Sequence, residues 1–201
     1  MGIFVAVLLG FTHAFEADHI AAVSTMVTKR KRLLLAMKDG MYWGLGHSST
    51  ILMIGVLILV AKQNISNETF AYLEALVGLM LILLGGWRLW QLNTERQQLR
   101  FNDSGHHLAA YGIGMVHGLA GSGTLLAVVI SQLDSISGSL LYLLLFGIGS
   151  VIGMLLAAGV FSLPFSRKGL ALPKVQTGLV LLSALICIFI GGRLFLENLI
   201  G

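Results

Sequence analysis

The chain has 201 residues, of which 56% are hydrophobic and 11% are charged, and its formal net charge is +4. An ordinary soluble domain has roughly 25% charged residues, so a soluble globule and a disordered chain are both excluded and a membrane protein is predicted. The positive charge comes from short loops and does not indicate a nucleic-acid partner.

Six apolar stretches are each long enough to cross a bilayer, which takes about 20 residues of helix. They form one transmembrane domain over residues 1–201 and leave no segment for a soluble domain. The predicted spans are 2–27, 38–61, 70–92, 108–133, 138–163 and 174–197. We expect no cleavable signal peptide, because the first residues lack a basic region.

The first predicted span holds four ionisable residues within seven positions: His13, Glu16, Asp18 and His19. Ionisable residues at membrane depth usually mark a transport pathway, since an aspartate there costs about 2.5–3.5 kcal/mol on insertion scales. On an unbroken helix, His13, Glu16 and His19 share one stripe, whereas Asp18 lies about 140° from His13. Either the helix is distorted here, or Asp18 orients a neighbouring histidine without binding the ion itself.

The second and fourth spans each add a histidine, His47 and His117. A histidine capped by a serine is the structural alternative for His47. Four glycines between Gly114 and Gly123 surround His117, and they indicate close helix packing, local unwinding, or both. We predict that neighbouring hydroxyl residues line the path or support the ligands, namely Ser48, Ser49, Thr50, Ser122 and Thr124.

Two further histidines, His106 and His107, fall in a predicted cytoplasmic loop over residues 93–107. We interpret them as solvated loop residues, with a weak metal-receiving patch as the alternative. The last span contains the single cysteine, Cys187, so a disulfide framework is excluded.

Basic residues fix the predicted orientation, because short cytoplasmic loops are enriched in lysine and arginine. Eleven of the thirteen fall on one side of the six spans, and only Lys62 and Arg193 fall on the other. We therefore predict an inner or plasma membrane protein with both termini outside. The eleven are Lys29, Arg30, Lys31, Arg32, Lys38, Arg88, Arg96, Arg100, Arg167, Lys168 and Lys174.

The two halves of the chain, residues 1–92 and 108–201, resemble each other. Gly10 and His13 match Gly114 and His117, each 104 residues later. The glycine pairs that begin at 44 and 85 match pairs that begin at 147 and 191. Because three spans per half is an odd number, the second half must insert upside down. The predicted fold is an all-α membrane protein with six transmembrane helices in a 3+3 inverted repeat and a midplane site, an arrangement typical of transporters.

Imidazole and carboxylate groups without a thiolate suit Ni, Co, Zn or Cu(II) better than Mg or Ca. The pattern His13-x4-Asp18-His19 resembles the HX4DH signature of the nickel/cobalt transporter family, and Leu45–Ser48 resembles its second motif. The run that starts at His117 is similar to that of the small permeases associated with urease maturation. This resemblance implies that His13, Asp18 and His19 are needed for nickel recognition, with a contribution from His47.

Typical members of that family have eight spans, and many carry an acidic motif where this chain has a glycine–serine run. We predict a permease that moves Ni²⁺ or Co²⁺ into the cytoplasm, with His13, Asp18, His19, His47 and His117 as metal ligands and Glu16 beside them. The alternatives are a metal efflux protein of the same fold and an intramembrane hydrolase. Expected partners are the divalent ion and the lipid bilayer, with a homo-oligomer and a cytoplasmic nickel acceptor of urease or hydrogenase maturation left open.

Overall fold

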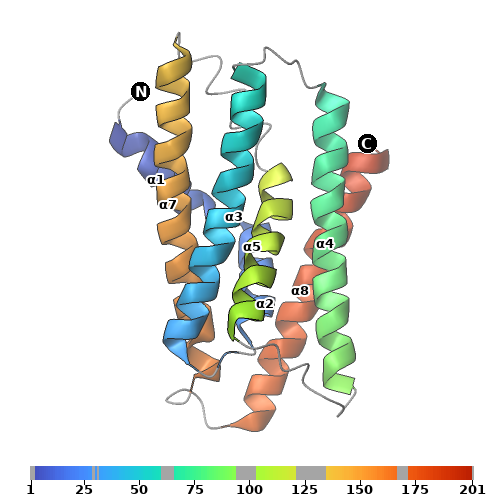
Figure 1. Cartoon of the computed structure of the whole chain (residues 1–201). Helices are drawn as coiled ribbons and strands as arrows, with labels where there is room; N and C mark the ends of the chain where they lie inside the picture. Colours follow the sequence, from blue (N-terminus) through green and yellow to red (C-terminus); the bar gives the residue numbers. More distant parts are fainter. Residues whose placement is uncertain are drawn as a thin grey trace.

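A computed structural model describes residues 3–28, 30, 32–59, 66–93, 103–120, 135–166 and 172–200 of the chain. Every element in these ranges is helical (Figure 1). The elements are α1 (Ile3–His13), α2 (Ala17–Val27), α3 (Leu33–Leu59), α4 (Asn67–Asn93), α5 (Asp103–Ala120), α7 (Ile136–Ser162), the 3₁₀ turn η1 (Leu163–Phe165) and α8 (Pro173–Ile200).

Four of these helices are long and apolar enough to cross a membrane, and the bent pair α1–α2 makes up to five spans. The predicted second, third, fifth and sixth spans correspond to α3, α4, α7 and α8. The fourth, predicted at 108–133, corresponds to α5 only as far as Ala120, because 121–134 lie outside the described residues together with Ser122 and Thr124. The protein is therefore a multi-pass helical membrane protein with four to five candidate spans in its described part.

The first span is broken in the middle. α1 ends at His13, α2 begins at Ala17, and their axes differ by 59°. Glu16 is extended, with φ −65° and ψ 157°, and turn hydrogen bonds run from Phe15 N–H to Thr12 and from Glu16 N–H to His13. The Thr12 hydroxyl also donates to the carbonyls of Leu8 and Leu9, a pattern that bends helices.

The helices pack in antiparallel pairs, α3 against α7 and α4 against α8, while α1 lies on α7 and α5 lies on α3 (Figure 1). Glycines allow the closest approaches: a Cβ at Gly10 would lie 1.9 Å from the carbonyl oxygen of Phe146, and one at Gly114 would lie 2.0 Å from that of Trp43. Small residues are the usual means of packing helices in lipid. These contacts hold the end of α1 and the end of α5 against α7 and α3.

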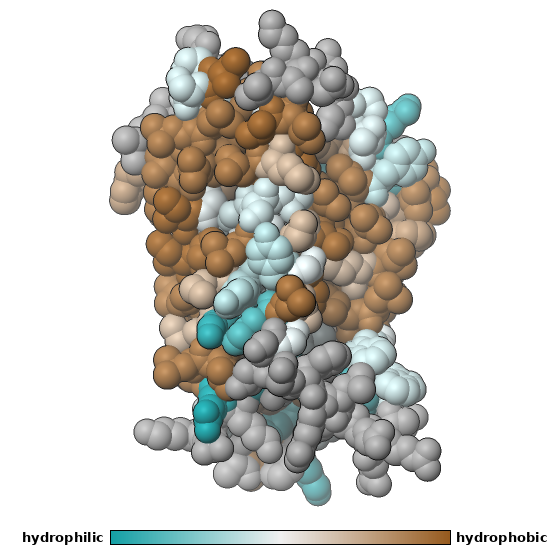
Figure 2. Space-filling model, viewed as in Figure 1, coloured by the Kyte–Doolittle hydropathy of each residue, from teal (hydrophilic) through white to brown (hydrophobic). Residues whose placement is uncertain are grey.

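The outer surface is largely apolar, as expected of a lipid-facing protein. Figure 2 shows hydrophobic residues over most of one face, with polar residues gathered in its middle and lower parts. Large aliphatic and aromatic side chains such as Phe4, Leu83 and Phe189 are exposed. The buried core includes Trp43, Leu81 and Met154.

The prediction of a solvated loop for His106 and His107 is wrong, because both residues lie in α5, which begins at Asp103. His107 is 7% exposed, and its Nδ1 lies 2.6 Å from a carboxylate oxygen of Asp39 in α3. The sequence around His107 is polar, which is typical of a loop. Its polarity is compensated inside the protein by Asp39, which is 68 residues away in the chain.

Candidate metal site

Four histidines from four helices meet in the interior of the bundle. They are His13 at the end of α1, His19 in the first turn of α2, His47 in α3 and His117 in α5. Their ring centroids are 4.4 Å apart for His13 and His19, 5.1 Å for His19 and His47, and 4.2 Å for His19 and His117. His19, His47 and His117 are almost completely buried. We call these four residues the histidine cluster.

The break between α1 and α2 makes this meeting possible. On a continuous helix, His13 and His19 would be almost two turns apart, at about 1.5 Å per residue. The 59° bend brings their rings into edge contact. It also places Asp18 between His19 and His117.

Two carboxylates hold three of the imidazole rings. Asp18 accepts a hydrogen bond from His19 Nδ1 at 3.0 Å through one oxygen and from His117 Nε2 at 2.9 Å through the other. Glu16 lies 2.9 Å from His13 Nδ1. A carboxylate at one ring nitrogen fixes the proton there and leaves the other nitrogen with a free lone pair, as in the carboxylate–histidine–metal arrangement of many metal sites.

The remaining ring nitrogens are buried and, within the described part of the chain, lack hydrogen-bond partners. They are His13 Nε2, His19 Nε2, His117 Nδ1 and both nitrogens of His47. A buried polar atom without a partner costs about 1–3 kcal/mol, so several in one place need a ligand to account for them. Neutral imidazole nitrogen binds first-row transition metals well, so this donor set fits a divalent ion such as Ni²⁺, Co²⁺, Zn²⁺ or Cu²⁺.

Two overlapping groups of three residues, or triads, have ligand atoms close enough together to bind one ion. One is His13, His19 and His47, and the other is Asp18, His19 and His117; in each, one ligand atom per residue lies within 4.8 Å of the others. His19 belongs to both triads. All five predicted metal ligands are therefore brought together, with Glu16 beside them but 59% exposed.

The hydroxyl residues after His47 are engaged elsewhere. Ser48 donates to the carbonyl of Gly147, Ser49 to that of Leu45 and Thr50 to that of Gly46. These bonds link α3 to α7 or lie within α3, so the three hydroxyls support the helix that carries His47.

Trp43 is a member of the site that the sequence analysis missed. It is completely buried, and its ring centroid lies 5.7 Å from those of both His19 and His117. Its indole nitrogen is also without a partner among the residues described. The available signal was its position four residues before His47, which places both side chains on one face of α3.

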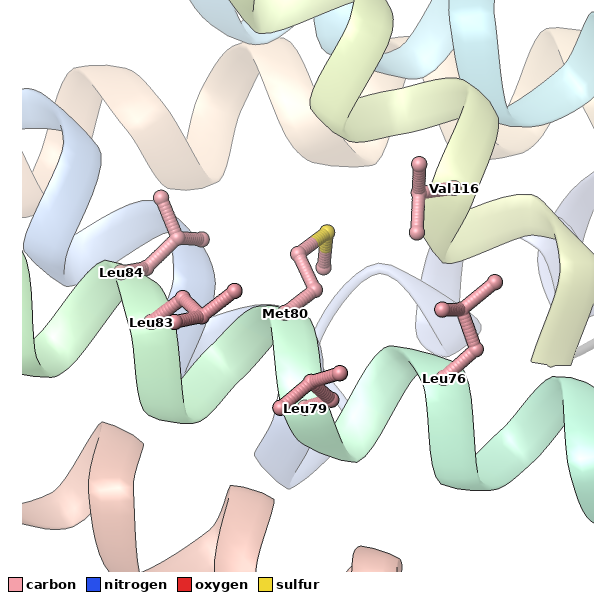
Figure 3. A pocket seen from close by; sticks show the side chains of 6 residues that line it. All are labelled: Leu76, Leu79, Met80, Leu83, Leu84 and Val116. Carbon is pink, nitrogen blue, oxygen red and sulfur yellow. The ribbon is translucent and has the colours of Figure 1, made fainter.

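A separate cavity of about 330 Å³ lies between α4 and α5 (Figure 3). Only apolar side chains line it: Leu76, Leu79, Met80, Leu83, Leu84 and Val116. It offers no imidazole or carboxylate ligand, and the candidate site is therefore the histidine cluster.

Comparison with known proteins identifies relatives among nickel-transport proteins. Residues 1–98, which contain His13, Asp18, His19 and His47, match the family model described as NicO, high-affinity nickel-transport protein. The urease accessory protein UreH of Bacillus sp. (strain TB-90) is 36% identical over 171 residues, which cover 79% of this chain and 75% of that protein.

Two further relatives match shorter stretches. The nickel transporter NixA of Staphylococcus aureus is 42% identical over 72 residues, which cover 34% of this chain and 20% of that protein. The cobalt transport protein NhlF of Rhodococcus rhodochrous is 28% identical over 78 residues, or 37% of this chain and 22% of that protein. No solved structure matches the chain.

Proposed function

Because the chain belongs to the NicO family of high-affinity nickel-transport proteins, and is thus a nickel or cobalt permease and not an enzyme, we propose that it carries Ni²⁺ into the cytoplasm through the histidine cluster. The observation that carries this proposal is the set of unpartnered imidazole nitrogens that converge from four helices. An ion bound there exchanges its water for imidazole ligands at membrane depth.

The two triads give the ion two overlapping sets of ligands. His13, His19 and His47 form an all-imidazole set, with Asp18 holding the His19 ring. His117 joins through its free Nδ1, or Asp18 turns to the ion and gives up its hydrogen bonds to the two rings. Because His19 is common to both sets, the ion can pass between them without losing all its protein ligands.

We propose that the six predicted spans form a 3+3 inverted repeat. Contacts recur in support of it: Gly10 meets Phe146 while Gly114 meets Trp43, and Gly149 meets Val7 while Gly46 meets Tyr111. Each contact becomes its counterpart when the residue numbers of one half are shifted by 103 or 104. The opposite directions of α3 and α7, and of α4 and α8, agree with an axis in the membrane plane (Figure 1).

The proposed orientation places the lower end of Figure 1 in the cytoplasm. At that end α2, α4 and η1 finish and α3, α5 and α8 begin, whereas the start of α1 and the end of α8 lie toward the other end (Figure 1). Arg30 and Arg32 lie between the end of α2 and the start of α3. An inside-negative potential then favours entry of a divalent cation by about 2 × 2.3 kcal/mol per 100 mV. The urease accessory relative favours a cytoplasmic nickel acceptor as the next partner.

Uptake into liposomes tests this proposal. We expect proteoliposomes with an inside-negative potential to accumulate ⁶³Ni²⁺, and unlabelled Co²⁺ to compete, because a potential of 100 mV corresponds to a concentration ratio of about 10³ for a divalent ion at equilibrium. Accumulation should collapse when the potential is removed. Export of preloaded Ni²⁺ against the same potential would support the efflux alternative and contradict uptake.

A further inference from the structure

A second group of ionisable residues lies on α3, α5 and the connection before α3, toward the lower end of the bundle. Arg30 donates to Asp39 through Nε at 2.5 Å and through Nη2 at 2.9 Å. His107 Nδ1 lies 2.6 Å from the same carboxylate, and the His107 ring stacks on Tyr42 with centroids 5.1 Å apart. We call Arg30, Asp39 and His107 the lower ion cluster.

The lower ion cluster is buried, since its three residues are 6%, 3% and 7% exposed. A buried ion pair is weak evidence for stability, because the cost of removing both charges from water can exceed their attraction. Ionisable residues inside membrane-spanning helices, such as Asp39 in α3 and His107 in α5, are rare and usually serve the transport path. The lower ion cluster therefore calls for a role beyond holding the fold together.

Its position in the bundle indicates that role. Asp39, Trp43 and His47 follow one another at four-residue intervals, so they lie along one face of α3. Above this level α3 and α5 touch through their backbones at Gly46, Gly114 and Gly118. At the level of Asp39 the two helices are joined through side chains, by the bond from His107 Nδ1 to the Asp39 carboxylate. Trp43 and then the lower ion cluster therefore lie between the histidine cluster and the lower end of the bundle.

We infer that the lower ion cluster is the closed exit of the metal path, with Arg30 and His107 as positioning residues that hold Asp39 until the ion leaves. This inference rests on the proposed function. When α5 moves away from α3, the bond from His107 to Asp39 breaks and the ion passes Trp43 to the cytoplasm. Arg30 keeps the Asp39 charge compensated while the exit is open.

The test measures access to a buried position just above the lower ion cluster. Ala110 lies in α5 three residues after His107, is 1% exposed and belongs to the same core cluster as Trp43. Ala110→Cys in a Cys187→Ala background provides a single thiol, and its rate of reaction with a polar maleimide is measured in nanodiscs, where both faces are accessible. The double substitution Arg30→Gln and Asp39→Asn weakens the lower ion cluster and so favours the open exit. It leaves no unpaired buried charge.

A matched control neutralises an ion pair outside the proposed path. Arg193 Nε lies 2.7 Å from Glu197 on α8, and both side chains are more than half exposed. Arg193→Gln with Glu197→Gln removes the same charges as the double substitution in the lower ion cluster. It should leave the labelling rate at position 110 unchanged.

We expect the Arg30/Asp39 double variant to label at least about tenfold faster, since a tenfold change in the opening equilibrium corresponds to about 1.4 kcal/mol. Its melting temperature should match that of the parent. An unchanged labelling rate in a folded double variant, or equal acceleration in the Arg193/Glu197 control, would overturn the inference. Ni²⁺ binding to the parent protein is measured in parallel. Absence of Ni²⁺ binding would contradict the proposed function, whereas the labelling rates measured without metal would still test whether the lower ion cluster closes the exit.

Discussion

Replacing His19 by alanine should abolish Ni²⁺ uptake and lower Ni²⁺ affinity by more than about 100-fold, beyond the 10–100-fold loss typical of removing a supporting residue. His19 contributes to both candidate triads, and its Nε2 is buried without a partner among the described residues. Its loss leaves each triad with two ligands, and a site at this depth has little water to replace the third. Calorimetric titration of purified protein and ⁶³Ni²⁺ uptake measure the two effects.

Two further variants make the result specific. Asp18→Asn should cost affinity about 10–100-fold and leave residual uptake, because it weakens the hold on two rings but removes no imidazole. His106→Ala removes an imidazole from α5 outside the histidine cluster and should retain Ni²⁺ affinity. Wild-type affinity in a folded His19→Ala protein would contradict the assignment.

Adding a single methyl group at Gly10 or at Gly114 should destabilise the protein and weaken Ni²⁺ binding. The new Cβ would lie 1.9 Å or 2.0 Å from a carbonyl oxygen of the facing helix, so the backbones must move apart. Alanine is intrinsically better than glycine in a helix by about 1 kcal/mol, but overpacking costs about 1–3 kcal/mol. Each glycine also comes three residues before a member of the histidine cluster, His13 or His117.

Gly86→Ala is the matched control, because a Cβ there meets nothing within 4 Å. We expect Gly86→Ala to have an unchanged or higher melting temperature, while Gly10→Ala and Gly114→Ala melt lower and bind Ni²⁺ less tightly. Equal melting temperatures for all three variants would show that the close approaches of α1 to α7 and of α5 to α3 are not required.

The apolar spans and the residues of the site were predictable because each depends on local sequence. Length and hydropathy alone locate α3, α4, α7 and α8 to within a few residues. The helical positions of His13 and Asp18 already required a distortion or an orienting role for Asp18. The structure contains the distortion, and Asp18 bonds to two histidine rings.

What the sequence did not indicate depends on contacts between distant residues. The second partner of Asp18 is His117, 99 residues away, and the partner of His107 is Asp39. A short polar stretch around His107 is typical of a loop, but in the structure the buried carboxylate of Asp39 compensates the polarity of His107 inside the bundle. Trp43 was overlooked because an aromatic residue in an apolar span has no pattern that separates a core side chain from one beside the site.

X-ray absorption spectroscopy of the Ni²⁺-loaded protein tests the central claim most directly, because it identifies the ligand atoms without relying on transport. The histidine cluster predicts a first shell of nitrogen and oxygen, with the outer-shell scattering of at least three imidazoles and no sulfur. The imidazole signal should decrease in the His47→Gln variant. A sulfur ligand, or a shell of oxygen alone without imidazole scattering, would contradict nickel binding by the histidine cluster.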